Sequence, residues 1–169
     1  EVSATYQSEI LLRSILFVCT GNIFRSMIAE HALRAQLPQD SDWRVSSAGT
    51  GANPMMMYDV VRVRLIELGI DPTDHVQRKL TQDILDGADL PVAMSLDHQA
   101  FVCEHFGREI PLYNRVCYDK DEPVLDLGES LPDWKADPAG ADAYVLQMVD
   151  SIWESTPSFI SRADNYLAI

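Results

Sequence analysis

The sequence of 169 residues has only three cysteines, Cys19, Cys103 and Cys117, and they lie far apart. An odd number of cysteines at such distances does not form a disulfide framework, and no two of them have the spacing of a metal site. These absences favour a reducing compartment. We therefore expect a cytoplasmic location, no bound metal and no cofactor.

Basic residues are also scarce. Lysine and arginine together number 13, against 26 aspartates and glutamates, so the formal net charge is −13. Binding to nucleic acid depends on basic side chains that neutralise backbone phosphates. We therefore expect no nucleic-acid partner.

Long apolar runs are absent as well. Hydrophobic residues make up 47% of the chain, which is enough for a core, but no run approaches the roughly 20 residues that cross a bilayer. The first residues include Glu1 and Glu9 and have no basic region before an apolar run. We therefore expect neither a membrane span nor a secretory signal. Without repeats or low-complexity segments, the length fits one domain.

The most informative stretch is Ile15–Ser26, which reads ILFVCTGNIFRS. Its four initial apolar residues predict a strand that is buried on both faces. Gly21 and Asn22 both tolerate positive φ and predict a tight turn. Met27–Leu37 then has the apolar spacing of a helix with one buried face. A cysteine therefore lies where the strand ends, and an arginine lies where the helix begins.

This arrangement predicts an anion site. The backbone N–H groups of the turn and the positive end of the helix form a concave site for an oxyanion. Arg25 adds a planar fork that matches two phosphate oxygens, and the same positive field favours the thiolate form of Cys19. The stretch thus supplies a nucleophile and a stabiliser of equatorial charge for phosphoryl transfer. The alternative is an inert cysteine that ends a core strand.

The rest of the chain alternates between strand-like and helix-like segments. Further strands are predicted at 43–47, 90–94 and 110–112, and further helices at 58–68, 82–85, 96–106 and 141–155. Between them, Tyr113–Ala136 is acidic and is expected to be a long loop. The alternation predicts a single α/β domain with a four-stranded parallel sheet, doubly wound, with helices on both faces. We place this domain at 14–157, after an N-terminal extension at 1–13 and before a C-terminal tail at 158–169.

The loop sequence Cys-Thr-Gly-Asn-Ile-Phe-Arg-Ser resembles that of the low-molecular-weight protein tyrosine phosphatases, whose loop reads Cys-x-Gly-Asn-x-Cys-Arg-Ser. Three further segments also look like those of the family, namely Ser47–Gly51, His75–Thr81 and Asp137-Pro138. The resemblance extends from about Ser14 to the last helix, and it implies the same fold with the loop after the first strand.

The resemblance also implies roles for individual residues. Cys19 is expected to be the nucleophile, Arg25 the oxyanion binder and Asp137 the general acid. Asn22 is expected to hold the loop in shape, and Ser26 to donate a hydrogen bond to the thiolate. The residues expected to bind substrate are Thr20, Gly21, Asn22, Ile23, Phe24, Ser26 and Asn53.

Two of these assignments have competing interpretations. A histidine of the family's His-x-x-Arg segment supports the loop asparagine, which implies the same role for His75, whereas a surface histidine without a role is the alternative. Asp133 is an alternative acid, because the neighbouring Trp134 can desolvate it. Asp137 is favoured, because Pro138 and the helix that follows fix its backbone.

Two positions depart from the family pattern. Phe24 replaces a second loop cysteine that forms a protective disulfide with the nucleophile, so this safeguard is not expected. Asn53 replaces a rim residue that is often aromatic, which makes a preference for phosphotyrosine less secure than phosphatase chemistry itself.

Together these features predict hydrolysis of a phosphotyrosine protein or a small aryl phosphate through a cysteinyl-phosphate intermediate. Arsenate reduction on the same fold is an alternative that requires a second thiol close behind the third strand. The chain has Ser95 at that place, and Cys103 follows eight residues later. A non-hydrolytic phosphate-binding module or a phosphocarrier is a third possibility, against which the Asp137-Pro138 pair argues.

Overall fold

The computed structural model describes residues 11–167, and most of the expected extension at 1–13 lies outside them. The centre of the molecule is a parallel sheet. Its strands are β1 (Arg13–Cys19), β2 (Trp43–Gly49) and β3 (Leu90–Ala93). They are ordered β2-β1-β3, so that Phe17 of β1 lies opposite Ser47 of β2 and Val92 of β3. The strand that contains the apolar run Ile15–Val18 is therefore the central one.

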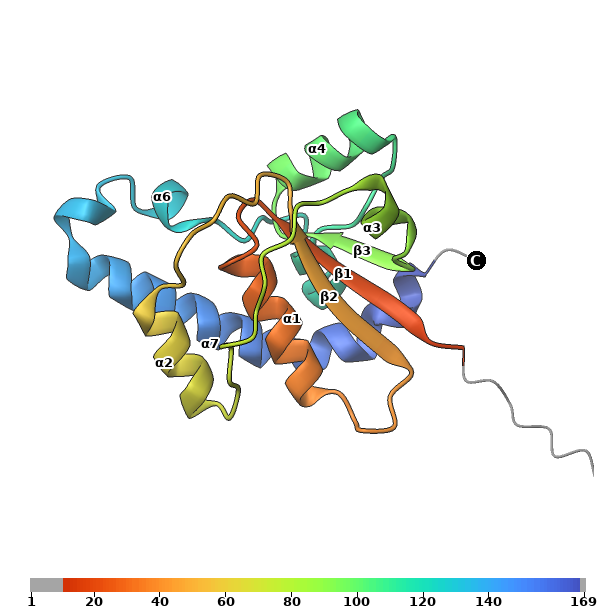
Figure 1. Ribbon diagram of the computed structural model, residues 1–169, viewed down its shortest axis with the longest axis horizontal. Coiled ribbons are helices and arrows are strands. Elements are labelled where there is room, and N and C mark those ends of the chain that lie inside the picture. Colours follow the sequence, from red (N-terminus) through yellow and green to blue (C-terminus); the bar gives the residue numbers. More distant parts are fainter. Residues whose placement is uncertain (1–10, 168–169) are drawn as a thin grey trace, which may run out of the picture.

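Helices cover both faces of this sheet (Figure 1). They are α1 (Arg25–Gln36), α2 (Asp59–Glu67), α3 (Gln82–Asp86), α4 (Leu96–Phe106), α5 (Tyr113–Tyr118), α6 (Leu127–Ser130), η1 (Trp134–Ala136), α7 (Pro138–Arg162) and η2 (Ala163–Tyr166). Ile15 and Phe17 of β1 pack with α1 and α7, whereas Leu16 and Val18 pack with α3 and α4. Alternate residues of β1 therefore belong to two separate cores. No helix within residues 11–167 combines the length and the apolar character needed to cross a bilayer.

The prediction of a four-stranded sheet is wrong, because the described residues form three strands. The expected strand at 110–112 makes only one bridge, between Leu112 and Ala93. The Ala93 N–H donates to the Pro111 carbonyl at 2.9 Å. Pro111 itself has no N–H with which to continue a ladder, and helix α5 begins at Tyr113.

The segment expected to be a long acidic loop contains α5, α6 and η1. A reciprocal cap explains how the short helix α6 forms among acidic residues. The Asp126 carboxylate accepts the Leu127 N–H at 2.9 Å, and Glu129 accepts the Asp126 N–H at 3.0 Å. Just before this cap, the Val124 N–H donates to the Met94 carbonyl at 2.8 Å. The acidic segment is thus tied to the end of β3.

Helix α7 extends beyond both of its predicted ends and passes through Pro157. A proline cannot donate to the carbonyl four residues before it, which here belongs to Trp153. The Gln36 side chain of α1 donates to that carbonyl instead, at 3.0 Å. Beyond the proline, the Phe159 ring is buried at 5.2 Å from the Phe17 ring. The expected C-terminal tail therefore begins as part of this helix.

The end of α7 should contribute strongly to stability. We expect Phe159→Ala to lower the free energy of unfolding by about 3–5 kcal/mol, because it leaves a cavity in the core. The matched control is Val63→Ala on α2, where the side chain is 55% exposed and the expected change is within about 0.5 kcal/mol. Urea unfolding followed by circular dichroism measures both variants. A similarly small change in both would show that the core does not depend on Phe159.

Candidate active site

The loop between β1 and α1 lies at the carboxyl end of the central strand, and we call residues 19–26 the Cys19 loop (Figure 1). Ligands of parallel sheets bind at this edge. The end of β2 packs directly behind the loop, since a Cβ atom on Gly49 would lie 2.3 Å from the Thr20 carbonyl oxygen. Only glycine allows such a close approach of two backbones.

Asn22 gives the loop its shape. Its φ of +53° lies in the left-handed region, which few non-glycine residues adopt. Its buried amide nitrogen donates to Ser26 Oγ at 3.1 Å and to Ser47 Oγ at 2.7 Å. Its amide oxygen accepts the Arg78 N–H at 2.8 Å. Asn22 therefore joins the start of α1, strand β2 and the segment before α3.

The first two carbonyl groups of the loop are held from outside by backbone. The Thr50 N–H donates to the Cys19 carbonyl at 2.9 Å, and the Gly51 N–H donates to the Thr20 carbonyl at 3.0 Å. The residues that follow β2 thus run alongside the loop and fix its first half.

The next two carbonyl groups are held by side chains. Gln77 Nε2 donates to the Gly21 carbonyl and His75 Nε2 donates to the Asn22 carbonyl, each at 2.7 Å. With its carbonyls directed outward, the loop turns its N–H groups inward. Within the described part of the chain, no N–H of residues 20–26 donates a hydrogen bond. The result is a cradle of unused donors.

The Cys19 thiol is 2% exposed and lies 2.9 Å from Ser26 Oγ. Because Ser26 Oγ accepts a hydrogen bond from Asn22, its own hydrogen can be donated to the sulfur. A donor in this position stabilises a thiolate. The chain of contacts continues behind Asn22, where Ser47 Oγ donates to Glu30 Oε1 at 3.0 Å. The sulfur is thus connected to a buried carboxylate of α1.

Arg25 is 3% exposed and is fixed along one edge of its guanidinium. Nη1 donates to the Val124 carbonyl at 2.9 Å and to Ser95 Oγ at 3.4 Å, and it lies 3.7 Å from Glu129 Oε1. Nε and Nη2 have no hydrogen-bond acceptor among residues 11–167. The fixed edge orients the fork, and the other edge can bind an anion.

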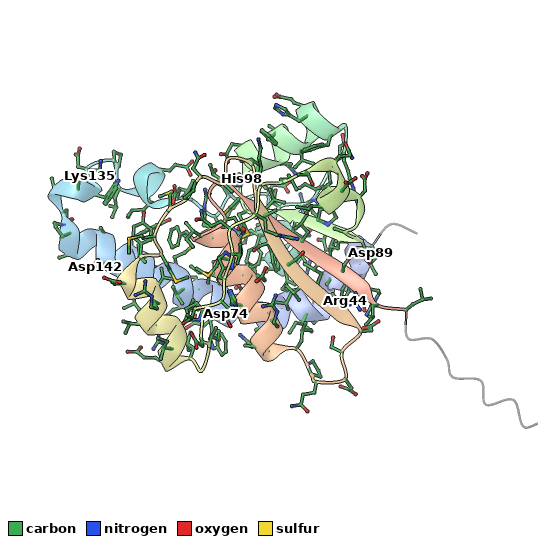
Figure 2. All side chains as sticks on the ribbon, in the orientation of Figure 1. Arg44, Asp74, Asp89, His98, Lys135 and Asp142 are labelled. Atoms are coloured by element: carbon green, nitrogen blue, oxygen red, sulfur yellow. The ribbon has the colours of Figure 1, made fainter. Side chains whose placement is uncertain are left out.

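His98 of α4 borders the loop, although it was not among the predicted site residues (Figure 2). Its Nδ1 accepts the Ser95 N–H at 3.1 Å, so its Nε2 carries the proton and donates to Thr20 Oγ1 at 2.9 Å. Burial, with a smaller effect of the Arg25 charge, lowers the pKa of His98 to about 4. The imidazole is therefore neutral at neutral pH.

The predicted rim residue Asn53 is exposed, and its carbonyl accepts a hydrogen bond from Gln77 at 2.8 Å. The apolar part of the rim comes from its neighbourhood instead. Met55 is 58% exposed and lies beside Gly21, as does Ile23. These two side chains form an apolar border on one side of the loop.

Phe24, which replaces the second loop cysteine, is buried and packs edge-on against Tyr58 with ring centroids 5.5 Å apart. All three cysteines are free. Cys103 is exposed on α4, and burial raises the pKa of Cys117 to about 11. The structure therefore provides no thiol next to Cys19 within the described residues.

The two predicted acids do not contact the loop. The Asp137 carboxylate is exposed and accepts the Gly140 N–H at 3.0 Å, which caps α7. Asp133 is also exposed, directly before η1. Figure 2 shows Lys135, which lies between them in sequence, at the edge of the molecule and well apart from His98. The acid assignment thus has no supporting contact in this conformation.

A buried thiol, a half-fixed guanidinium and inward-facing N–H groups at the end of a parallel sheet define a site for a tetrahedral oxyanion. Comparison of the sequence with known families agrees with a site of this kind. The family model of low molecular weight phosphotyrosine protein phosphatase matches residues 14–119. The chain belongs to this family.

Individual relatives support the same family. The probable low molecular weight protein-tyrosine-phosphatase AmsI of Erwinia amylovora is 36% identical over 55% of this chain and 63% of its own length. The arsenate reductase of Brevibacillus brevis is 34% identical over 73% of this chain and 84% of its own length. The chain spans a little under two thirds of the length of AmsI and of other curated relatives.

A similar fold occurs in the YwlE arginine phosphatase, solved as a mutant with a phosphorylated active-site serine. The TM-score is 0.74 at 25% sequence identity, and the alignment covers 89% of this chain and 95% of that one. The parallel sheet and its surrounding helices are thus those of the phosphatases to which the sequence is related.

The buried His98 should make stability depend on pH. Its pKa is about 4 in the folded chain and 6.5 in the unfolded chain, so the unfolded chain binds more protons below pH 6.5. The contribution of the neutral His98 to the free energy of unfolding is fully present above pH 6.5. It falls by about 3 kcal/mol as the pH is lowered toward 4. His98→Gln should flatten this part of the pH profile of unfolding free energy. His105→Gln, at an exposed position of α4, should not, and equal profiles for both variants would contradict the assignment.

Proposed function

We propose that this chain hydrolyses phosphotyrosine and other aryl phosphate monoesters through a cysteinyl-phosphate intermediate. The observation that carries the proposal is the Cys19 loop, in which a buried thiol faces converging N–H donors and the unpaired edge of Arg25. Membership of a phosphotyrosine phosphatase family supports the same chemistry.

In the first step, the loop N–H groups and Nε and Nη2 of Arg25 hold the three non-bridging phosphoryl oxygens. The Cys19 thiolate, stabilised by the hydroxyl of Ser26, attacks phosphorus opposite the ester oxygen. The S–P bond forms as the P–O bond breaks. The electron pair leaves with the phenolate oxygen, which receives a proton from a carboxylic acid.

In the second step, water attacks the phosphorus of the cysteinyl phosphate. The carboxylate that gave its proton in the first step now accepts one from this water. The P–S bond breaks, inorganic phosphate leaves and the thiolate is regenerated. The phosphorylated active-site serine of the YwlE mutant supports such a covalent intermediate.

We assign the proton donor to Asp137, with Asp133 as the alternative acid. The Asp-Pro sequence and the rigid helix α7 directly behind it support this choice. Gly140 is needed there, because a Cβ at that position would lie 2.1 Å from Asp137 Oδ2. Glu129 is a further competitor, since it lies at Arg25.

The border formed by Met55 and Ile23 supports a substrate with an aromatic ring. Sulfur and methyl groups pack well against aromatic faces. We propose phosphotyrosine proteins or small aryl phosphates in the cytoplasm as the substrates, and His75 as a support of the loop through Asn22. Comparing hydrolysis of phosphotyrosine with that of phosphoarginine tests the substrate class directly.

Arsenate reduction is the second candidate, because a relative of 34% identity is named an arsenate reductase. That reaction reduces arsenate to arsenite with two electrons from a pair of thiols, which become a disulfide, so the nucleophile needs a second thiol within reach. Here Ser95 occupies the position close to the loop, Cys103 points to solvent, and burial keeps Cys117 protonated by raising its pKa to about 11. These observations favour the phosphatase. Thioredoxin-dependent arsenate turnover would reverse this preference.

The roles of Cys19 and Arg25 can be separated by substitution. Cys19→Ser is expected to abolish turnover of p-nitrophenyl phosphate and to retain binding of inorganic phosphate, because a serine hydroxyl stays protonated at neutral pH. Arg25→Ala is expected to lose both, since the fork binds substrate and transition state alike. Steady-state kinetics and calorimetric titration measure the two properties, with Cys103→Ser as a control that keeps wild-type rates. Wild-type turnover by Cys19→Ser would rule out the covalent route.

The acid can be identified by varying the leaving group. Asp137→Ala is expected to lower the rate with phenyl phosphate by about 10²–10⁴, the range of general acid catalysis. The loss should be smaller with p-nitrophenyl phosphate, whose leaving group departs without a proton. Asp133→Ala and Glu129→Gln should not show this difference between the two substrates. If one of these variants shows the larger loss with phenyl phosphate and Asp137→Ala does not, the general acid is that residue and not Asp137.

A further inference from the structure

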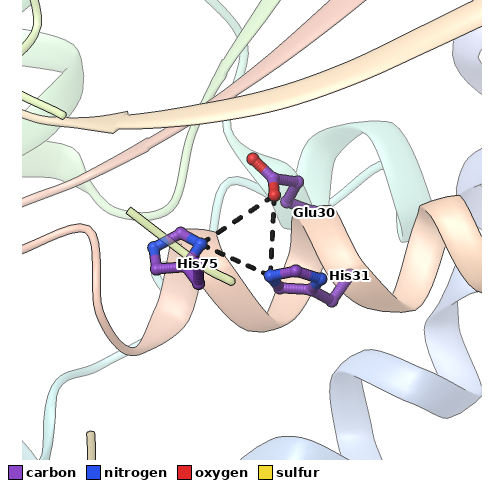
Figure 3. Close-up of side chains that lie close together, drawn as sticks. All are labelled: Glu30, His31 and His75. Carbon is purple, nitrogen blue, oxygen red and sulfur yellow. Dashed lines mark hydrogen bonds and ion pairs between the residues drawn. The ribbon is translucent and has the colours of Figure 1, made fainter. Parts of the chain in front are cut away.

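Behind the Cys19 loop, three side chains that can ligate a metal converge (Figure 3). Glu30 and His31 belong to α1, and His75 belongs to the segment between α2 and α3. His31 Nε2 lies 3.3 Å from His75 Nδ1 and 3.6 Å from Glu30 Oε2, and His75 Nδ1 lies 4.0 Å from the same oxygen. Each side chain thus directs one atom that can ligate a metal to a common point.

These distances fit a small metal ion. Metal–ligand distances of about 2.1 Å in a tetrahedral zinc site place neighbouring ligand atoms about 3.4 Å apart. The two separations from His31 therefore need to change by only about 0.1 and 0.2 Å, and the separation of His75 from Glu30 by about 0.6 Å. Two imidazoles and one carboxylate form a donor set that suits Zn²⁺ and the neighbouring divalent transition metals.

The hydrogen bonds of His75 leave the correct nitrogen available. Its Nε2 carries the proton, because it donates to the Asn22 carbonyl at 2.7 Å. In the neutral ring, Nδ1 therefore accepts the hydrogen bond from His31 Nε2 at 3.3 Å. A metal ion would take the place of that shared proton, with the proton of His31 moved to its Nδ1. A backbone carbonyl that fixes the far nitrogen of the ring is the usual support of a metal-ligating histidine.

The surrounding charges are mixed. Arg34 lies 3.1 Å from Glu30 Oε2 and opposes a cation there. Its side chain is 54% exposed and also donates to the Val45 carbonyl, so it can keep a partner when it turns away from the carboxylate. Asp71 and Asp74 line the same surface depression of about 520 Å³ as the three ligands. This depression gives a cation a path from solvent, with Asp71 and Asp74 as favourable charges on its border and Arg34 and Arg78 as opposing ones.

We propose that Glu30, His31 and His75 bind one Zn²⁺ or a similar divalent transition metal, with a fourth position open to water. This departs from the sequence-based expectation that the chain binds no metal. The site touches the Cys19 loop twice, through the bond from His75 to the Asn22 carbonyl and through Ser47, which bridges Glu30 and Asn22. Metal binding is thereby coupled to the conformation of the loop, and each should influence the other.

Calorimetric titration with Zn²⁺ tests the proposal. It is done on the Cys19→Ser chain, because a thiolate in the loop would itself bind zinc. We expect one Zn²⁺ per chain at neutral pH and an affinity at least about tenfold weaker after the further change His31→Ala, which removes one of three ligands. His105→Ala, on the other face of the sheet, is the matched control and should leave the affinity unchanged. Co²⁺ should give the visible absorption of a tetrahedral site in the same His31-dependent way.

Unfolding measurements complete the test. Without metal, the His31→Ala chain should unfold at nearly the same temperature as its parent, which shows that it folds. Added Zn²⁺ should raise the unfolding temperature of the parent only, because it binds the folded site. Equal Zn²⁺ affinities with and without His31 would overturn the proposal, and so would the absence of saturable binding to the folded parent chain. None of these outcomes depends on phosphatase activity.

Discussion

The left-handed conformation of Asn22 is the constraint on which the site depends. A φ of +53° turns the chain between β1 and α1 so that its carbonyls point outward and its N–H groups point inward. Such a conformation is unfavourable for most side chains. It persists because the buried Asn22 amide bonds to Ser26, Ser47 and the Arg78 N–H. The same residue that bends the loop also fixes the hydroxyl beside the Cys19 sulfur.

The fold supplies the partners of the loop from both sides of the central strand. Because β1 lies between β2 and β3, the chain that leaves each neighbour passes the loop. Thr50 and Gly51 follow β2 and bind loop carbonyls, while Ser95 follows β3 and lies at Arg25. The N–H groups and the guanidinium edge that we propose to bind an oxyanion are thus held in place by the fold itself, which is the condition for electrostatic catalysis without reorganisation.

The features predicted correctly from sequence are those with a local cause. The buried strand and the loop follow from apolar runs and turn residues, and α2 ends just before Gly69, whose φ of +84° favours glycine. The prediction of a fourth strand is wrong because Pro111 has no N–H with which to continue a ladder. The predicted end of α7 is too early, because the Trp153 carbonyl, which Pro157 cannot bond, accepts a hydrogen bond from the distant Gln36 side chain. His98 and Gln77 meet the loop across 78 and 56 residues of sequence. The place of His98 shortly after a strand end indicates that it can border the site, but no local pattern predicts its contact with Thr20 or the contact of Gln77 with Gly21.

The most direct test of this dependence on Asn22 is the affinity for vanadate, a tetrahedral oxyanion, in the Asn22→Gly chain. Glycine accepts the positive φ without strain but cannot make the three side-chain hydrogen bonds. If these bonds hold the cradle together, the affinity should fall by about 10- to 100-fold, as expected for one to three kcal/mol of lost buried hydrogen bonding. Wild-type vanadate affinity in a folded Asn22→Gly chain would contradict the central role of this residue.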